Sequence, residues 1–338
     1  MKVKPMSHEM KVYILETLRG AQGEWVSGER LREPFGVSRM AVSKQVRALR
    51  EKGYGIETGT RKGYRLLSEP DGLYPEMVLP RLQGTRFAEG PYKALDVTSS
   101  TNDEIRTLAE TGVAEGAMVT AEVQMAGRGR RGRTWFGQRG DSLMVSLLLR
   151  PPIPPSRCGL LPLLTAVAMR EALTSLGVVG VGIKWPNDLI LEGRKLGGIL
   201  CEISSDFESV SHAVIGLGLN VNTRERTFPE EVRPLACSLR MVTGRVWPRL
   251  EILEAYLRQM DRYLAEAWRG EFSRMLADWR AGSVTLGRRI EVTMPDGQRV
   301  TGKALDVDDS GALIFEADCG RVMHLTSGEV SLGAGSTE

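Results

Sequence analysis

The residues best suited to chemistry lie in one short segment rich in arginine and glycine. Residues 127–133 read Gly-Arg-Gly-Arg-Arg-Gly-Arg and are followed by Thr134 and Trp135. Glycine allows sharp turns and brings backbone N–H groups close to a ligand, while each guanidinium donates a fork of hydrogen bonds to carboxylate or phosphate oxygens. The segment therefore predicts a loop that folds over anionic groups. A nonspecific nucleic-acid contact or a flexible surface loop is the alternative, but apolar strands on both sides favour a ligand lid.

Three further polar segments stand where strands meet helices or turns. Ser99-Ser100-Thr101-Asn102 separates an expected strand from an acidic helix, and its side chains suit either a small polar head group or an ordinary helix cap. Lys184-Trp185-Pro186-Asn187-Asp188 ends one strand and begins the next, so Asp188 can orient phosphates or bond its own turn. Lys195 shortly precedes a Gly-Gly pair, and its ammonium can face a phosphate or lie on the surface.

Composition excludes several classes of protein. A chain of 338 residues with 42% hydrophobic and 26% charged residues is typical of two or three globular domains. No apolar run reaches the ~18 residues of a membrane span, and the basic start lacks the apolar stretch of a secretory signal. The 4 cysteines and 3 histidines are scattered, which disfavours a zinc site or a disulfide framework. We therefore expect no metal held by protein ligands alone, and a cytoplasmic location.

Positive charge is concentrated at the amino terminus. Residues 1–67 carry 14 Lys/Arg and 7 Asp/Glu, a balance of +7, whereas the other residues carry 31 and 35, a balance of −4. Apolar spacing predicts a helix over residues 8–19, a short helix opened by Ser27, and a third helix over residues 39–52 capped by Ser38. The apolar side of the third helix is expected to hold Met40, Val42, Val46 and Leu49. This order is that of a helix-turn-helix.

A basic hairpin follows the third helix and completes a winged helix-turn-helix. Strands over residues 53–58 and 63–67 are joined by a turn that contains Arg61 and Lys62, which can reach DNA phosphates. On the third helix, the residues predicted to bind DNA are Arg39, Ser43, Lys44 and Arg47. A small helical unit for dimerisation or docking is the alternative. The clustering of basic residues on the third helix and the hairpin favours DNA.

The rest of the chain divides into a central and a terminal part. From residue 92 to about residue 222, apolar strand-like runs alternate with helical stretches, and two amphipathic helices follow over residues 249–268 and 272–280, which predicts an α/β unit. After Gly282, short strands with turns at residues 295–297 and 309–311 predict a small β-barrel. The predicted fold is multidomain α+β: a winged helix-turn-helix over residues 1–67, a linker over 68–76, a catalytic α/β domain over 77–282 and the barrel over 283–338.

These segments together resemble the biotin protein ligases, and the whole layout is similar to the bifunctional ligases that also act as biotin-operon repressors. The Arg/Gly segment with Trp135 and the segment Lys184–Asp188 match that family nearly letter for letter. The resemblance covers almost the whole chain and implies that the terminal barrel is SH3-like. Lipoate ligases share the fold but carry a different Arg/Gly motif, so the resemblance favours biotin.

The resemblance also implies roles for individual residues. Biotin is expected to bind Ser100, Thr101, Asn102, Gln124, Arg128, Gly129, Arg130 and Lys195. The nucleotide is expected to contact Arg128, Arg130, Arg131, Asn187, Asp188 and Asn220. Arg130, Lys195 and Asp188 are expected to act in catalysis. Trp247 lies where some relatives stack a tryptophan on adenine, but its local sequence departs from their pattern and it is left unassigned.

The reaction implied by the resemblance has two steps. The carboxylate of biotin attacks the α-phosphate of ATP to give biotinyl-5′-AMP, with Mg²⁺ and basic side chains neutralising charge. A lysine of a biotin carboxyl carrier protein then displaces AMP. The resemblance further implies repression at operator DNA by a homodimer when the adenylate is bound. Two alternatives stay open: a ligase with a vestigial winged helix, and a transcription regulator whose α/β domain only senses a small carboxylic acid.

Overall fold

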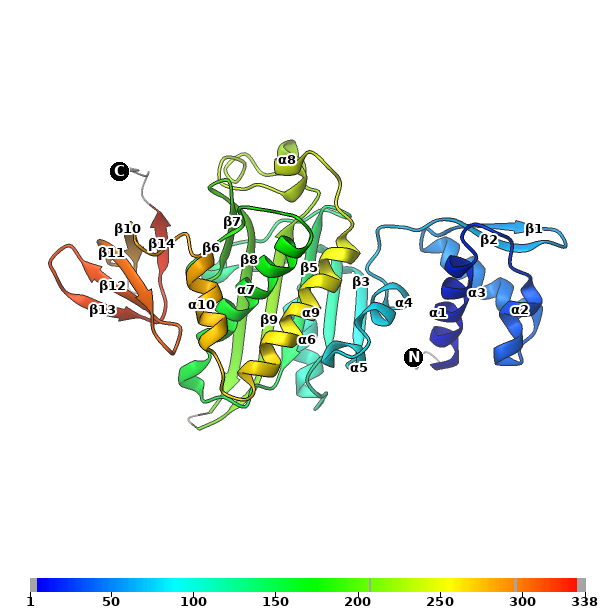
Figure 1. Ribbon diagram of the computed structural model, residues 1–338, viewed down its shortest axis with the longest axis horizontal. Coiled ribbons are helices and arrows are strands. Elements are labelled where there is room, and N and C mark those ends of the chain that lie inside the picture. The colour runs from blue at the N-terminus through cyan, green and yellow to red at the C-terminus, as the bar shows by residue number, and fades with distance from the viewer. Residues whose placement is uncertain (1–4, 207, 295–296, 333–338) are drawn as a thin grey trace. The chain divides into compact units, whose positions relative to one another are not determined.

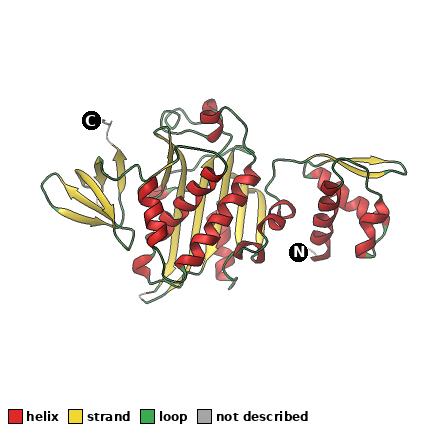
Figure 2. Ribbon diagram, viewed as in Figure 1, coloured by secondary structure: helices red, strands yellow, loops and turns green. Residues whose placement is uncertain are grey.

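The computed structural model describes residues 5–206, 208–294 and 297–332, and the chain forms two compact units. The first is Met1–Gln83 and the second is Gly84–Glu338. Figure 1 labels their elements, and Figure 2 distinguishes helices from strands. Among the described helices, none is both long and apolar enough to cross a membrane.

The first unit is a winged helix-turn-helix, as the sequence predicts. Its elements in chain order are α1 (Pro5–Gly20), α2 (Gly28–Arg32), the 3-10 helix η1 (Glu33–Phe35), α3 (Arg39–Glu51), β1 (Gly55–Gly59) and β2 (Gly63–Ser68). The two strands pair antiparallel. The Ser27 and Ser38 hydroxyls cap α2 and α3 by accepting from backbone N–H groups at 3.2 and 3.3 Å, which satisfies donors left open at a helix start.

The core side of α3 differs from the predicted one at Met40. Val42, Val46 and Leu49 are buried, whereas Met40 is 80% exposed. Each residue turns an α-helix by about 100°, so Met40 lies roughly 200° away from Val42. The prediction for Met40 was wrong because residues two apart in a helix point to opposite sides.

The first unit also extends beyond the linker predicted over residues 68–76. A short helix, α4 (Pro75–Val78), followed by the 3-10 helix η2 (Leu79–Leu82), packs against α1. Glu76 is 2% exposed, and its carboxylate accepts a hydrogen bond from Lys52 Nζ at 2.5 Å. Burial and this ion pair attach the segment to the winged helix, which is why the unit ends at Gln83 and not in the polar stretch before it.

A seven-stranded sheet forms the centre of the second unit. Its strand order is β3-β4-β5-β9-β8-β7-β6. The strands are β3 (Tyr92–Thr98), β4 (Met118–Gln124), β5 (Ser142–Leu149), β6 (Gly182–Lys184), β7 (Asp188–Leu191), β8 (Arg194–Ser205) and β9 (Val210–Asn220). β3 pairs with β4 in parallel, and the other described pairs are antiparallel. The apolar runs of residues 92–222 form these strands.

Helices pack on this sheet and bury it. Those of the second unit are α5 (Arg86–Glu89), α6 (Thr101–Glu110), α7 (Leu160–Ser175), α8 (Leu239–Thr243), α9 (Arg249–Ala267) and α10 (Ser273–Gly282), with 3-10 turns η3 (Arg130–Gly132), η4 (Pro155–Arg157) and η5 (Glu225–Thr227). α7, α9 and α10 lie together across one face in Figure 1. Ile105 and Ala109 of α6 pack in a separate cluster on Val119 and Val214. Every residue of β5 is buried, as expected of a strand covered on both faces.

The carboxy-terminal part is the small β domain that the sequence predicts. Its strands are β10 (Arg289–Thr293), β11 (Arg299–Val307), β12 (Leu313–Ala317), β13 (Val322–Leu325) and β14 (Glu329–Leu332), and they form one antiparallel sheet in the order β13-β12-β11-β10-β14. Trp185 joins this domain to the seven-stranded sheet, because its backbone N–H donates to Thr285 Oγ1 at 2.9 Å and its indole N–H to the Gly311 carbonyl at 3.2 Å. The turn expected at residues 295–297 lies mainly outside the described residues.

Candidate functional site

The second unit contains a cavity of about 730 Å³. Its walls come from the Arg/Gly loop, the first turn of α6, the segment between β6 and β7, and strands β8 and β9. Gly328–Ser331 of the carboxy-terminal domain complete it. The residues predicted from sequence for biotin and nucleotide all line this cavity: Ser100, Thr101, Asn102, Gln124, Arg128, Gly129, Arg130, Arg131, Asn187, Asp188, Lys195 and Asn220.

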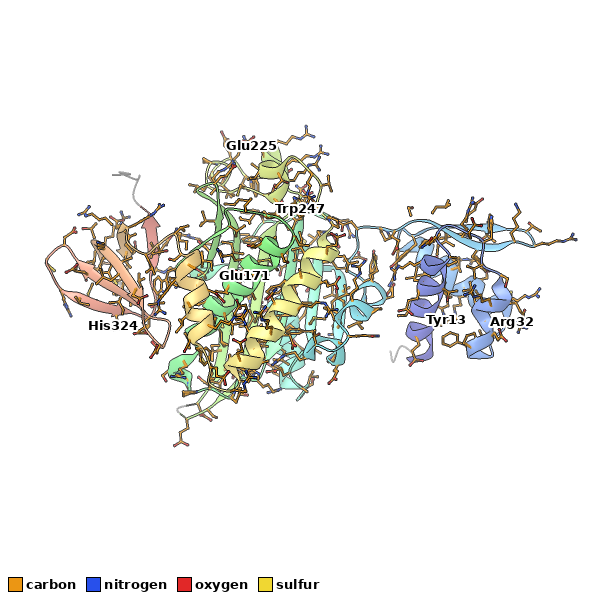
Figure 3. The ribbon with its side chains drawn as sticks, viewed as in Figure 1. Tyr13, Arg32, Glu171, Glu225, Trp247 and His324 are labelled. Carbon is orange, nitrogen blue, oxygen red and sulfur yellow. The ribbon has the colours of Figure 1, made fainter. Side chains whose placement is uncertain are left out.

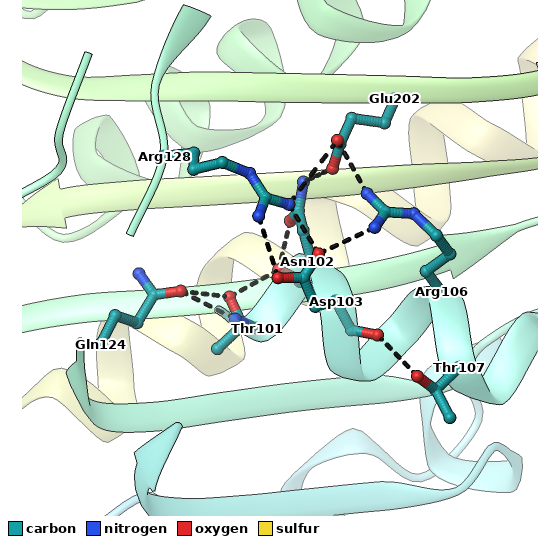
Figure 4. A network of polar contacts seen from close by, with 9 residues as sticks. Thr101, Asn102, Asp103, Arg106, Thr107, Gln124, Arg128 and Glu202 are labelled. Carbon is teal, nitrogen blue, oxygen red and sulfur yellow. Dashed lines mark hydrogen bonds and ion pairs between the residues drawn. The ribbon is translucent and has the colours of Figure 1, made fainter. Parts of the chain in front are cut away.

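One part of the cavity wall is a hydrogen-bonded polar floor, formed by Ser100, Thr101, Asn102 and Gln124. Gln124 Oε1 accepts from the backbone N–H and the hydroxyl of Thr101 at 2.8 and 3.1 Å. The buried Ser146 hydroxyl lies 2.7 Å from Thr101 Oγ1 and 2.6 Å from Asn102 Oδ1. Ser100 precedes α6 without a side-chain cap bond. The polar groups of Thr101, Asn102 and Gln124 are therefore fixed in orientation and suited to a small polar ligand (Figure 4).

The Arg/Gly loop is anchored at several points along its length. Trp135 N donates to the Gly127 carbonyl at 2.9 Å and Gly129 N to the Arg133 carbonyl at 2.7 Å, so the loop folds back on itself. Arg131 has a positive φ of 56° inside it. The loop arginines reach different elements: Arg128 pairs with Asp103 of α6, Arg130 donates to Asn187, and Arg131 and Arg133 contact the carboxy-terminal domain at Thr293 and Glu329.

A cluster of cations, Arg130, Lys184 and Lys195, surrounds Asp188. Lys195 Nζ lies 2.7 Å from Asp188 Oδ1. Burial lowers the pKa of Lys184 and that of Arg130, and in both cases the negative charge of Asp188 partly offsets the effect. Cationic groups that have lost water in this way are stabilised by an anionic ligand. The cluster is therefore suited to bind phosphate or carboxylate groups.

Comparison with known proteins agrees with this geometry. Residues 94–220 match the Biotin/lipoate A/B protein ligase family, residues 12–65 an HTH domain and residues 285–333 the Biotin protein ligase C terminal domain. The Bifunctional ligase/repressor BirA of Bacillus subtilis is 32% identical over 97% of this chain and 100% of its own length. The chain belongs to the biotin protein ligase family.

A second bifunctional relative matches almost the whole chain, and a solved ligase structure matches about seven tenths of it. The Escherichia coli Bifunctional ligase/repressor BirA is 33% identical over 92% of this chain and 94% of its own. The structure of the Biotin protein ligase from Aquifex aeolicus in complex with biotin and ATP aligns at 30% identity with a TM-score of 0.61, covering 71% of this chain and 97% of that one.

Sequence reasoning missed several residues of this ligase site. Lys184 begins the segment Lys184–Asp188 but has no predicted role, because its partial burial exists only in the folded chain. Glu202 and Ser146 have no local signal, since each reaches the polar floor from a distant strand. Gly216 and Gly218 have a packing role: a Cβ at residue 216 would clash with Asn102, and one at residue 218 with the Trp135 indole.

Two predicted positions have structural partners inside the ligase domain. Asn220 is 4% exposed and donates to the Cys237 carbonyl at 3.1 Å. Asn187 donates to the Ile199 carbonyl at 2.8 Å while accepting from Arg130.

Trp247, labelled in Figure 3, is 3% exposed, and the Arg245 guanidinium lies 3.5 Å from its ring centroid. It is absent from the described lining of the cavity.

The residues predicted to bind DNA form a separate exposed surface on the first unit. Arg39, Ser43, Lys44 and Arg47 are exposed on α3, and Arg61 and Lys62 are exposed at the hairpin tip. Arg50 joins the two elements, because it donates to the Ile56 carbonyl at 2.6 Å and to Thr58 at 2.7 Å. Helix and wing are thereby held in one arrangement.

Proposed function

We propose that the protein activates biotin with ATP and transfers the biotinyl group to a lysine of a biotin carboxyl carrier protein. The observation that carries the proposal is that the polar floor, the cation cluster and the Arg/Gly loop all line one cavity. The floor matches a small polar head group, and the cations match a carboxylate beside a phosphate. Full-length similarity to bifunctional ligase/repressors supports the same reaction.

In the first step, a biotin carboxylate oxygen attacks the α-phosphorus of ATP. The new O–P bond replaces the bond to the β-phosphate, and pyrophosphate leaves. Arg130, Lys184 and Lys195 neutralise the growing negative charge, and their partial burial strengthens that interaction. In the second step the neutral amine of the acceptor lysine attacks the acyl carbon of biotinyl-5′-AMP and loses a proton, and AMP leaves. Positioning and charge stabilisation account for the rate.

Mg²⁺ fits this site as a partner of the nucleotide. Mg²⁺ is commonly held by one or two carboxylates together with substrate phosphates. Asp188 and Glu329 are carboxylates on the cavity wall, and the described residues contain no group of three or more metal-ligating side chains. The ion would supply charge neutralisation at the phosphates.

The first unit supports a second role as a biotin-responsive repressor. Its basic helix and wing have the form that places a recognition helix in the major groove. Many helix-turn-helix proteins bind paired half-sites as dimers. The resemblance to bifunctional ligase/repressors implies the same here, so the proposal includes a homodimer when biotinyl-5′-AMP is bound.

The ligase proposal is tested with ATP, biotin and a biotin-acceptor domain. A biotinyl mass added to one acceptor lysine supports it, and biotin binding without pyrophosphate release would show a pure sensor instead. The repressor part is tested by footprinting DNA upstream of biotin genes with the adenylate-loaded protein, together with sedimentation. Absence of protection at micromolar protein contradicts repression and leaves a ligase with a vestigial winged helix.

A further inference from the structure

The guanidinium of Arg128 is engaged by the first turn of α6. Its Nη1 and Nη2 donate to the two carboxylate oxygens of Asp103 at 2.9 and 2.6 Å, the forked geometry that arginine and carboxylate favour. Arg106 donates to Asp103 and to Glu202, each at 2.8 Å, and Glu202 lies 3.8 Å from Arg128. Two positive and two negative side chains thus form a neutral network at the edge of the cavity (Figure 4).

The base of this network is fixed to the sheet. Thr101 and Asn102, which precede Asp103, are 4% and 3% exposed. Asn102 donates to Glu202 Oε2 at 2.6 Å and accepts from the buried Ser146 hydroxyl at 2.6 Å. The backbone that presents Asp103 is therefore held in place, whereas Arg128 belongs to an irregular loop and is 39% exposed. It follows that Asp103 determines where this end of the loop lies.

We propose that Asp103 is a positioning residue that clamps the Arg/Gly loop over the cavity through Arg128. The clamp places Arg130, two residues later, next to the anionic groups of the ligand, so this inference rests on the proposed ligase function. It gives Arg128 a role in loop placement instead of the ligand contact that the family resemblance implies. Both partners are partly exposed, so the pair has the strength of a surface ion pair and is screened by salt.

Three substitutions test the clamp. Asp103→Asn removes the charge with almost no change in shape, and Asp103→Glu restores it. Asp96→Asn is the control for loss of a carboxylate charge, because Asp96 forms a more exposed pair with Arg139 at 2.8 Å outside this network. The full chain is digested with trypsin without biotin or ATP, and cleavage within residues 128–133 is mapped by mass spectrometry. In parallel, release of biotinyl-5′-AMP is followed at low and high ionic strength.

At low ionic strength we expect Asp103→Asn to raise both loop cleavage and adenylate release roughly two- to fivefold. Asp103→Glu should show cleavage and release rates closer to those of the wild type. Asp96→Asn should show the same rates as the wild type. High salt should bring the wild type toward the rates of Asp103→Asn, because it screens the pair. Unchanged loop cleavage overturns the proposal, and so does faster cleavage with unchanged adenylate release. If no adenylate forms at all, the ligase function fails, while ligand-free cleavage still decides whether Asp103 holds the loop.

Discussion

Replacing Arg130 with alanine should weaken retention of biotinyl-5′-AMP more than any other change in the Arg/Gly loop. The Arg130 guanidinium is half-buried, and burial lowers its pKa. It donates to a neutral oxygen, Asn187 Oδ1, at 3.2 Å. A hydrogen bond between such a partly buried cation and an anionic ligand contributes about 2 kcal/mol to the free energy of binding. Loss of that bond corresponds to a roughly 30-fold faster release of the adenylate.

The assay loads the protein with labelled biotinyl-5′-AMP and measures its dissociation into excess unlabelled ligand. Arg133→Ala is the control within the same loop, because the Arg133 side chain is 65% exposed and pairs with Glu329. An exposed pair is worth about 1 kcal/mol or less, so this variant should change release by less than about fivefold. Arg130→Lys keeps the charge but lacks the paired guanidinium donors. Its rate of adenylate release should therefore lie between those of Arg130→Ala and Arg133→Ala. Equal dissociation rates for Arg130→Ala and the wild type would refute the reasoning, as would an equally large effect of Arg133→Ala.

Three further predictions follow from other parts of the second unit. Lys195→Ala removes a cation 2.7 Å from Asp188 and should slow pyrophosphate release about 10²- to 10³-fold; a near-normal rate would show that Lys195 is misassigned. Arg249 is 1% exposed and pairs with Glu122 at 3.0 Å, so Arg249→Met should destabilise the protein to urea by about 3–5 kcal/mol, and adding Glu122→Met should recover much of the loss. Burial alone would raise the pKa of Asp308, but hydrogen bonds from His324 (Figure 3), Ser310 and the Ala312 backbone outweigh it and lower the pKa to about 2. Because the folded pKa lies below the unfolded value, this stabilisation is present above pH ~4 and is lost as pH falls toward 2; thermal unfolding of Asp308→Asn should therefore depend less on pH in that window.

Local sequence was enough to predict most elements and a set of residues that line one cavity in the structure. Apolar runs and caps predicted the strands of the central sheet and the helices of the first unit, since periodicity reports which face of an element is buried. Glycine and arginine alternate in a way that neither a helix nor a strand tolerates, so the loop at residues 127–133 was visible at once. The prediction from local sequence was wrong at Met40. This apolar residue was assigned to the buried face of α3, but it lies on the exposed face.

Tertiary structure alone decided which polar and charged side chains meet. Arg133 and Glu329 are 196 residues apart in the chain, and Asn102 and Glu202 are 100 apart, so no local pattern can pair them. The burial of Lys184 and the pairing of Arg128 with Asp103 likewise depend on how strands and loops from different segments pack. Residue types in a sequence specify the chemistry that is possible, whereas burial and partner distances, which set charge energies, exist only once distant segments have come together.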